Sequence, residues 1–177
     1  MLLKVLAALG ILVLIFLFYV STKPGHFSYT RNGIIKASPE KIFPYLSQLK
    51  MGSMWSPYEK IDPNMKHNFI GTDGIPGAKM EFEGNSKAGS GSLEMLSMIP
   101  NQKVEYRLLM TKPMKADNKV IYTLEPTPEG TRFTWTMTGE SNFIGKLFST
   151  LIDCEKMVGD QFEEGIQNLK TVVEAQK

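Results

Sequence analysis

The stretch from Asn142 to about Ala175 constrains the fold most, because its apolar residues recur every three or four positions. This spacing places them on one broad stripe of an α-helix. A helix of this length cannot bury such a stripe alone, so earlier segments must supply a broad apolar surface. The stripe consists of Phe143, Ile144, Leu147, Phe148, Leu151, Ile152, Met157, Val158, Phe162, Ile166, Leu169, Val172 and Val173.

Two glycines interrupt this predicted helix, at Gly159 and Gly165. Each costs about 1 kcal/mol relative to alanine in a helix interior. We therefore expect them to mark places where the helix bends or approaches the rest of the fold closely. Residues 143–152 are expected to form a separate first segment.

The amino-terminal residues 2–20 are apolar apart from Lys4. The unbroken run from residue 5 to residue 20 is about 24 Å long as a helix, and residues 2 and 3 bring it near the ~30 Å hydrocarbon thickness of a bilayer. This predicts an uncleaved single-pass transmembrane anchor over residues 1–22, in contact with the membrane through residues 2–20. A cleaved signal peptide is the alternative, but residues 19–22 are a poor cleavage site.

The basic residues on the two sides of the span are nearly balanced, because Lys4 precedes it while Lys23 and Arg31 follow it. The positive-inside rule therefore gives little indication of its orientation. An amino-terminal span followed by a folded domain usually acts as a signal anchor. We therefore expect the following domain to lie outside the cytoplasm.

Charge and cysteine content exclude several classes of function. A formal net charge of +2 is too small to indicate a nucleic-acid partner. Cys154 is the only cysteine, so no internal disulfide is possible. It and two isolated histidines, His26 and His67, form no metal-ligand pattern, so neither metal nor cofactor is expected. For His67 a solvated strand position is favoured over a catalytic one.

After a short linker over residues 23–26, the chain alternates apolar and polar residues in seven segments, which predicts an antiparallel sheet. A helix that begins at Ser38 as its N-cap and ends at Gly52, followed by a compact aromatic turn or short second helix at 54–58, interrupts them after the first strand. The layout is α+β, and one domain covers residues 27–177. The expected strands are 27–37, 65–71, 79–83, 92–99, 103–110, 119–125 and 131–138.

This order of elements is similar to the helix-grip fold of the START/Bet v 1-like superfamily. Five motifs add to the resemblance to its polyketide cyclase/dehydrase-like (SRPBCC) branch, over residues 27–174. They are IKASPEKIF at 35–43, MWSPY at 54–58, GIPGAKMEFEGN at 74–85, GTRFTWTM at 130–137 and FEEGIQNLK at 162–170. The resemblance implies a curved sheet of about seven strands wrapped around the long carboxyl-terminal helix, with a cavity between them.

For the wall of this cavity we predict ten aromatic and methionine residues, although each of them also suits a plain core. The leading hypothesis is a membrane-anchored domain that binds a hydrophobic or amphipathic small molecule such as a lipid. The ten residues are Trp55, Phe69, Met80, Phe82, Met95, Tyr106, Tyr122, Trp135, Met157 and Phe162.

Two other functions fit the same fold, so whether the protein is an enzyme stays open. An aromatase/cyclase-like enzyme would need a carboxylate or arginine in the cavity, and Glu105 with Arg107 would supply one only if their strand had the opposite register. A protein-interaction module would instead show a large exposed apolar patch beside a filled core. No catalytic residue is predicted.

Overall fold

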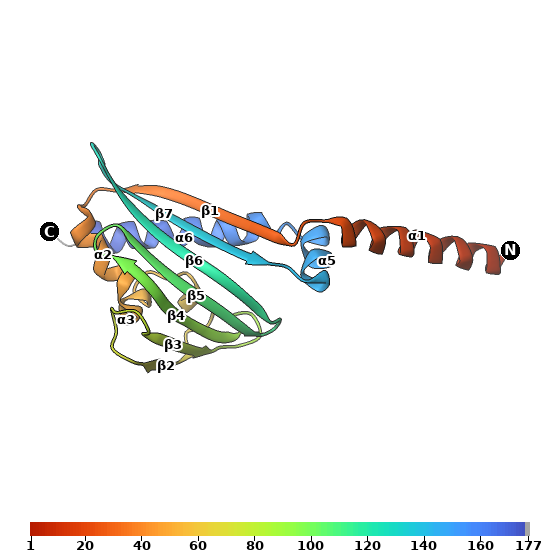
Figure 1. Ribbon diagram of the computed structural model, residues 1–177, viewed down its shortest axis with the longest axis horizontal. Coiled ribbons are helices and arrows are strands. Elements are labelled where there is room, and N and C mark those ends of the chain that lie inside the picture. The colour runs from red at the N-terminus through yellow and green to blue at the C-terminus, as the bar shows by residue number, and fades with distance from the viewer. Residues whose placement is uncertain (176–177) are drawn as a thin grey trace.

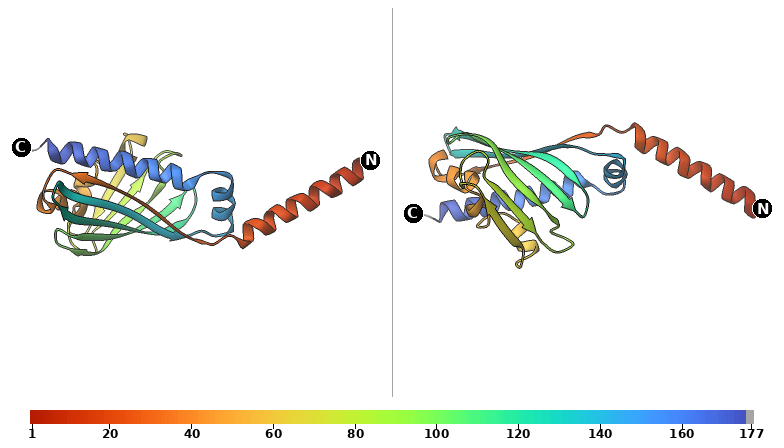
Figure 2. Two further views of the ribbon diagram at one scale, coloured as in Figure 1. Left: turned by 90° about the horizontal axis from the view of Figure 1, so that it is seen from above. Right: turned by 60° about the horizontal axis from the view of Figure 1, so that its bottom comes forward.

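The computed structural model describes residues 1–175, in which one long helix projects from a curved sheet that is packed on a second long helix (Figures 1 and 2). The last two residues of the predicted domain, 176–177, lie outside the described residues. The helices are α1 (Leu2–Thr22), α2 (Pro39–Ser47), α3 (Leu49–Gly52), α4 (Tyr58–Ile61), α5 (Phe143–Leu151) and α6 (Cys154–Glu174). The strands are β1 (His26–Ile35), β2 (Lys66–Ile70), β3 (Lys79–Glu83), β4 (Ser90–Ile99), β5 (Lys103–Lys112), β6 (Ala116–Thr127) and β7 (Gly130–Glu140).

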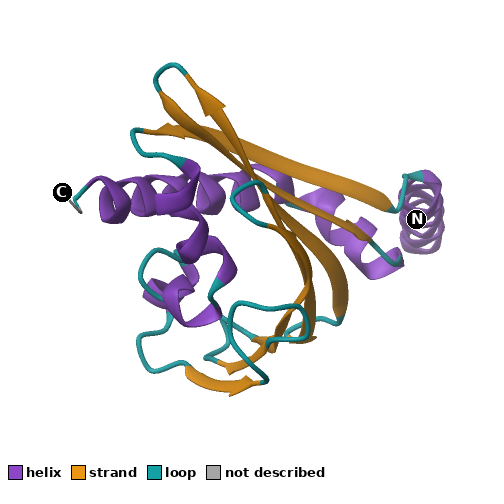
Figure 3. Ribbon diagram, turned by 60° about the vertical axis from the view of Figure 1, so that its left-hand side comes forward, coloured by secondary structure: helices purple, strands orange, loops and turns teal. Residues whose placement is uncertain are grey.

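The seven strands form one antiparallel sheet in the order β1-β7-β6-β5-β4-β3-β2. Consecutive strands pair from β2 through β7, and β1 returns to pair with β7. The sheet curves around α6, α2 and α3, which lie on its concave side (Figure 3). The predicted helix-grip arrangement is therefore confirmed.

Alternation along each strand separates the two faces of the sheet. On the concave face, Met95 pairs with Tyr106, and Tyr122 pairs with Trp135. The convex face carries charges, as the alternation predicts: Lys119 Nζ lies 2.7 Å from Glu105 Oε2. Glu105 and Arg107 therefore face solvent, so the alternative register that would place them in a cavity is not adopted.

The carboxyl-terminal stretch forms two helices, as expected. Asn142 caps α5 by accepting a hydrogen bond from Gly145 N at 2.9 Å. Asp153 caps α6 by accepting one from Lys156 N, also at 2.9 Å. Side chains that bind free amide groups stabilise a helix start. Asp153 therefore favours a new helix that begins at Cys154, shortly after α5 ends at Leu151.

Both glycines of α6 lie at close approaches, as predicted. A methyl group at Gly165 would come within 2.6 Å of Trp135 Cζ3 and 3.1 Å of Pro57 Cδ. At Gly159 it would overlap the guanidinium group of Arg31. The glycines thus allow β1, β7 and the loop before α4 to pack directly on the helix.

Three local expectations were wrong. The predicted helix from Ser38 to Gly52 breaks at Gln48 into α2 and α3, and Ser38 stands at the N-cap without a side-chain hydrogen bond to the helix backbone. Its hydroxyl instead bonds the Glu40 side chain, which lowers the pKa of that carboxyl. Strand β6 begins at Ala116, so residues 116–118 are not a turn. Cross-strand pairing with β5 outweighs the turn propensity of Asp117 and Asn118.

Candidate functional site

The space between the sheet and α6 is occupied by aromatic side chains that pack against one another. Trp135 stacks on Phe162 with ring centroids 4.2 Å apart. Trp55 meets Trp135 edge-on at 5.4 Å, and Tyr122 meets Trp135 edge-on at the same distance. These rings, with Phe133, fill the centre of the grip, so the residues in contact with α6 here are core residues.

Six of the ten predicted cavity residues belong to this buried cluster. Two of them have their polar groups satisfied by α2, because Tyr106 Oη donates to Leu46 O at 2.7 Å and Trp55 Nε1 donates to Tyr45 O at 2.9 Å. Burial raises the pKa of Tyr106 and of Tyr122, so both stay protonated at neutral pH. The six are Trp55, Met95, Tyr106, Tyr122, Trp135 and Phe162.

The other four predicted residues lie elsewhere. Met80 and Phe82 are half-buried on the concave face of β3, beyond the aromatic cluster. Phe69 is 40% exposed on the edge strand β2, and Met157 is 56% exposed on α6, so the structure does not bring these two into the grip.

The apolar concave face continues from β3 through β4 and β5. Leu93 pairs with Met80 on one side and with Leu108 on the other. All three are half-buried and pack against the core without being covered completely. This strip, which we call the concave strip (Met80, Phe82, Leu93, Leu108 and Met110), is the apolar part of the grip that the aromatic cluster leaves partly exposed.

A pocket of about 460 Å³ lies where β1 meets the connection between α5 and α6. This connection is at the end of the domain nearest α1 (Figure 1). We call it the mouth pocket; it is lined by Tyr29 and by residues 149–155. The sequence indicated Tyr29 only as strand content and did not single out the connection. The sequence feature that could have indicated the connection is the break between the two helical segments.

The mouth pocket contains the cysteine and one tyrosine. Burial is the main cause that raises the pKa of the Cys154 thiol, and the Asp153 carboxylate adds to it. Burial likewise raises the pKa of Tyr29, with Cys154, Glu155 and Asp153 as lesser causes. Both groups are therefore neutral near pH 7, which disfavours Cys154 as a nucleophile.

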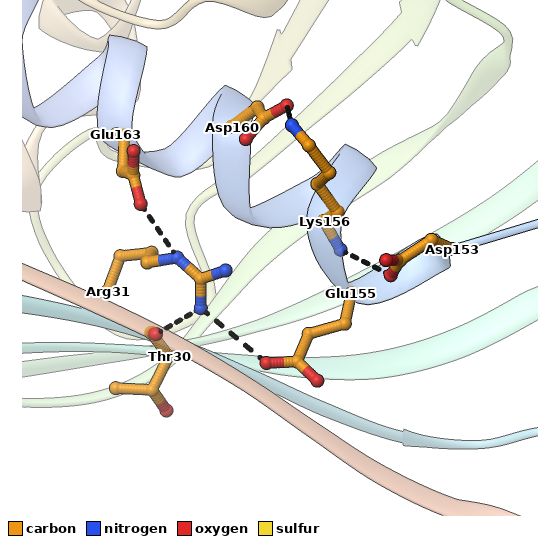
Figure 4. Close-up of polar contacts among 7 residues, drawn as sticks. All are labelled: Thr30, Arg31, Asp153, Glu155, Lys156, Asp160 and Glu163. Atoms are coloured by element: carbon orange, nitrogen blue, oxygen red, sulfur yellow. Dashed lines mark hydrogen bonds and ion pairs between the residues drawn. The ribbon is translucent and has the colours of Figure 1, made fainter.

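Arg31 is the charged group on the concave side of β1, beneath α6 (Figure 4). Its Nε donates to Glu163 Oε1 at 2.9 Å, and its Nη1 donates to Thr30 O at 2.9 Å and lies 3.9 Å from Glu155 Oε1. Because helix carboxylates pair with it, Arg31 joins β1 to α6 and is not an unpartnered catalytic cation.

Two buried polar groups on the concave face have no such partner among residues 1–175: Trp135 Nε1, within the aromatic cluster, and the side-chain oxygen of Asn118. Asn118 is 8% exposed, and its Oδ1 has no hydrogen-bond partner among residues 1–175. Its Nδ2 lies 3.8 Å from Met137 Sδ, a weak acceptor. Asn118 was not predicted as a site residue, because its sequence context is typical of a turn. An unpaired buried acceptor is costly, so this amide is the clearest polar feature that a ligand could satisfy.

A second pocket, of about 470 Å³, lies on the convex side of the sheet. Its lining includes Arg107, Lys119 and Thr138. The charges there pair with one another, since Arg107 Nη2 lies 2.6 Å from Asp117 Oδ2. Neither pocket contains any of the ten predicted cavity residues. His67 is half-buried on β2 with its Nε2 3.2 Å from Glu59 Oε1, and so is not the solvated residue expected.

Within residues 1–175, no group of three or more histidine, cysteine or acidic residues could hold a metal ion. Comparison with protein-family profiles matches residues 26–174 to the family described as polyketide cyclase / dehydrase and lipid transport. The chain belongs to this family. A comparison with curated proteins finds no significant match.

Solved structures share the fold of this family member at low sequence identity. Protein MLL2253 from Mesorhizobium loti is 18% identical with a TM-score of 0.63, over 85% of this chain and 99% of that one. The Aha1 dimer from Colwellia psychrerythraea is 20% identical with a TM-score of 0.60, over 85% and 98%. Ara h 8.0201 is 11% identical with a TM-score of 0.62, over 86% and 100%. Family and fold together support a ligand-binding domain.

Proposed function

We propose that this protein is a membrane-anchored domain that binds a hydrophobic or amphipathic, lipid-like small molecule on the concave side of its sheet. The observation that carries the proposal is the concave strip, an apolar surface that lies inside the grip but outside the filled aromatic cluster. A ligand there would lie along Met80, Leu93 and Leu108, where burial of its apolar surface drives binding.

The anchor in this proposal is α1, the helix that is long and apolar enough to span a membrane, with a mean hydropathy of 2.7. A cleaved signal sequence has the same length and composition. The intact mass of the purified protein separates the two, because an uncleaved chain has 19.9 kDa. Loss of about the first 22 residues would overturn the anchor. A carboxyl-terminal alkaline phosphatase fusion tests the proposed location outside the cytoplasm, and an inactive fusion would contradict it.

Native mass spectrometry of the full chain, purified from membranes in mild detergent, tests ligand binding directly. We expect a co-purified lipid-like species that organic solvent extracts. The decisive variant is Leu108→Glu, which places a charge on the concave strip and is expected to abolish the adduct. Leu109→Glu is the matched control, because the next residue of β5 points to the convex face and its substitution should leave the adduct unchanged.

Equal adduct in the wild type and both variants would show that the ligand lies elsewhere. A wild-type chain that never carries a ligand, even after incubation with lipid vesicles, would contradict ligand binding as a whole. Far-ultraviolet circular dichroism of each variant establishes that loss of the adduct is not loss of the fold.

A further inference from the structure

Helix α5 exposes an apolar stripe that the rest of the domain leaves uncovered. Every residue of α5 is at least partly exposed. Ile144 is 50% exposed, Phe148 44% and Leu151 68%, and their spacing places them on one face of the helix. We call these three residues the α5 stripe. Phe143 and Ile152 flank it and are 41% and 45% exposed.

Helix α5 also packs against the last turns of α1. Val20 is fully buried, and Phe16 and Leu17 are half-buried, whereas the preceding part of α1 is exposed. The two helices are tied further because Lys146 Nζ donates to Ser21 O at 3.5 Å. In both views of Figure 2, α5 runs across the end of α1 and does not lie along it.

These two contacts fix where α5 lies relative to a membrane that α1 crosses. Val20 is the last residue of the apolar run, so it lies at the boundary between hydrocarbon and headgroups. A helix that crosses α1 at this level lies in the plane of the interface. Amphipathic helices in that position bury their apolar face about 5–10 Å deep.

The low charge of α5 favours a lipid bilayer as the partner of the α5 stripe, bound mainly through apolar contact. Lys146 is its only charged residue, and that side chain already bonds the end of α1. The stripe therefore offers large apolar side chains without charges that would select a particular protein surface. Its continuity with the apolar surface of α1 points to the same environment for both.

We infer that α5 is a second membrane-contact element, which lies in the bilayer interface with the α5 stripe inserted among the lipids. The inference rests on the proposed anchoring by α1 and goes beyond it. Because residues 149–155 continue from α5 into the mouth pocket, this contact holds the mouth pocket at the bilayer surface.

The test uses the full chain with Cys154→Ser, so that one introduced cysteine carries an environment-sensitive fluorophore. Leu151→Cys labels the stripe, Ser149→Cys labels another side of the same helix, and Glu129→Cys labels the turn between β6 and β7, far from α1. Each protein is reconstituted into phosphatidylcholine vesicles with or without a lipid that carries a quencher at its acyl chain. All three sites are exposed, so the fold is retained.

We expect the label at residue 151 to emit at shorter wavelength and to be quenched about threefold or more relative to the label at residue 129, as interfacial insertion requires. The label at residue 149 should be quenched less than that at residue 151. Added anionic lipid should change little, because α5 carries so little charge.

Vesicle flotation distinguishes failure of the α1 anchor from failure of α5 to contact the membrane. A chain that does not float with vesicles overturns the anchor and this inference together. A chain that floats while the label at residue 151 is quenched no more than that at residue 129 overturns the inference alone. The inference also fails if the emission of the label at residue 151 shifts to shorter wavelength with rising protein concentration but is not quenched by the lipid quencher. A second protein molecule would then cover the stripe.

Discussion

The indole ring of Trp135 and the phenyl ring of Phe162 lie nearly parallel, with their planes inclined by 11° and their centroids 4.2 Å apart. The first belongs to β7 and the second to α6, so this stack joins the sheet to the helix it surrounds. Both side chains are buried, at 4% and 1% exposure. Much of the stability of the grip should depend on this pair.

We predict that Phe162→Ala lowers the free energy of unfolding by about 3–5 kcal/mol, because it removes the ring and leaves a cavity beneath Trp135. Urea denaturation, followed by tryptophan fluorescence, measures the change.

Met157→Ala on the same helix is the control. Its side chain is 56% exposed, so the substitution should change the free energy of unfolding by less than about 0.5 kcal/mol. A cost for Met157→Ala as large as for Phe162→Ala would mean that Met157 is covered in solution, and our description of α6 would then fail.

The two glycines of α6 should respond differently to alanine. At Gly165 the added methyl meets Trp135, whose ring is held by its stack, so Gly165→Ala is expected to cost about 1–3 kcal/mol. At Gly159 it meets the guanidinium group of Arg31, the end of a flexible side chain that can move aside by giving up its bonds to Glu163 and Thr30. The gain of about 1 kcal/mol in helix propensity offsets that loss, so Gly159→Ala should change the free energy of unfolding by less than about 1 kcal/mol. Thermal unfolding of both variants decides, and the reverse order would contradict these contacts.

Most of the fold could be predicted from the sequence, because strand alternation and helical spacing report directly on burial. The seven strands, the separation of α5 from α6 and the close approaches at Gly159 and Gly165 all follow from such local patterns. The start of β6 did not, because residues 116–118 have turn composition. Their pairing with β5 depends on a neighbour whose register no local pattern specifies.

The candidate site was predictable only in part, for a related reason. An aromatic residue in the right alternation phase faces the concave side, but its sequence does not say whether it fills the core or lines a space. Trp135 and Met80 share that phase, yet one is covered by α6 and the other is not. Asn118 and the connection over residues 152–153 are placed by tertiary packing, so their role was invisible before the structure.

Buried tyrosines should make the protein sensitive to alkaline pH. The pKa of Tyr106 and of Tyr122 is raised in the folded chain by burial, whereas an unfolded tyrosine ionises near pH ~10. Their contribution to stability is thus fully present below about pH 10 and is lost above it, as the unfolded chain releases these protons first. Each group should lower the free energy of unfolding by about 1.4 kcal/mol per pH unit in that range.

Phenolate absorbance at 295 nm, recorded with urea unfolding at several alkaline pH values, measures both effects. Tyr122→Phe should reduce the pH slope above about pH 10, because one shifted group is gone. A native protein in which all six tyrosines ionise together near pH ~10 without unfolding would contradict the burial of these two.

Asn118→Leu should separate a structural from a ligand-binding role of the buried amide. Because Asn118 Oδ1 is buried without a partner among the described residues, an apolar side chain of similar size should leave the free energy of unfolding unchanged or raise it by about 1–2 kcal/mol. Asn32→Leu, at an exposed position of β1, is the control and should have little effect.

If a ligand hydroxyl or amide donates to Oδ1, Asn118→Leu weakens its binding about tenfold or more while Asn32→Leu does not. Calorimetric unfolding together with lipid titration gives both numbers. A loss of stability above about 1 kcal/mol in Asn118→Leu would show instead that the amide has a structural partner in solution, and the concave face would then lose its polar recognition point.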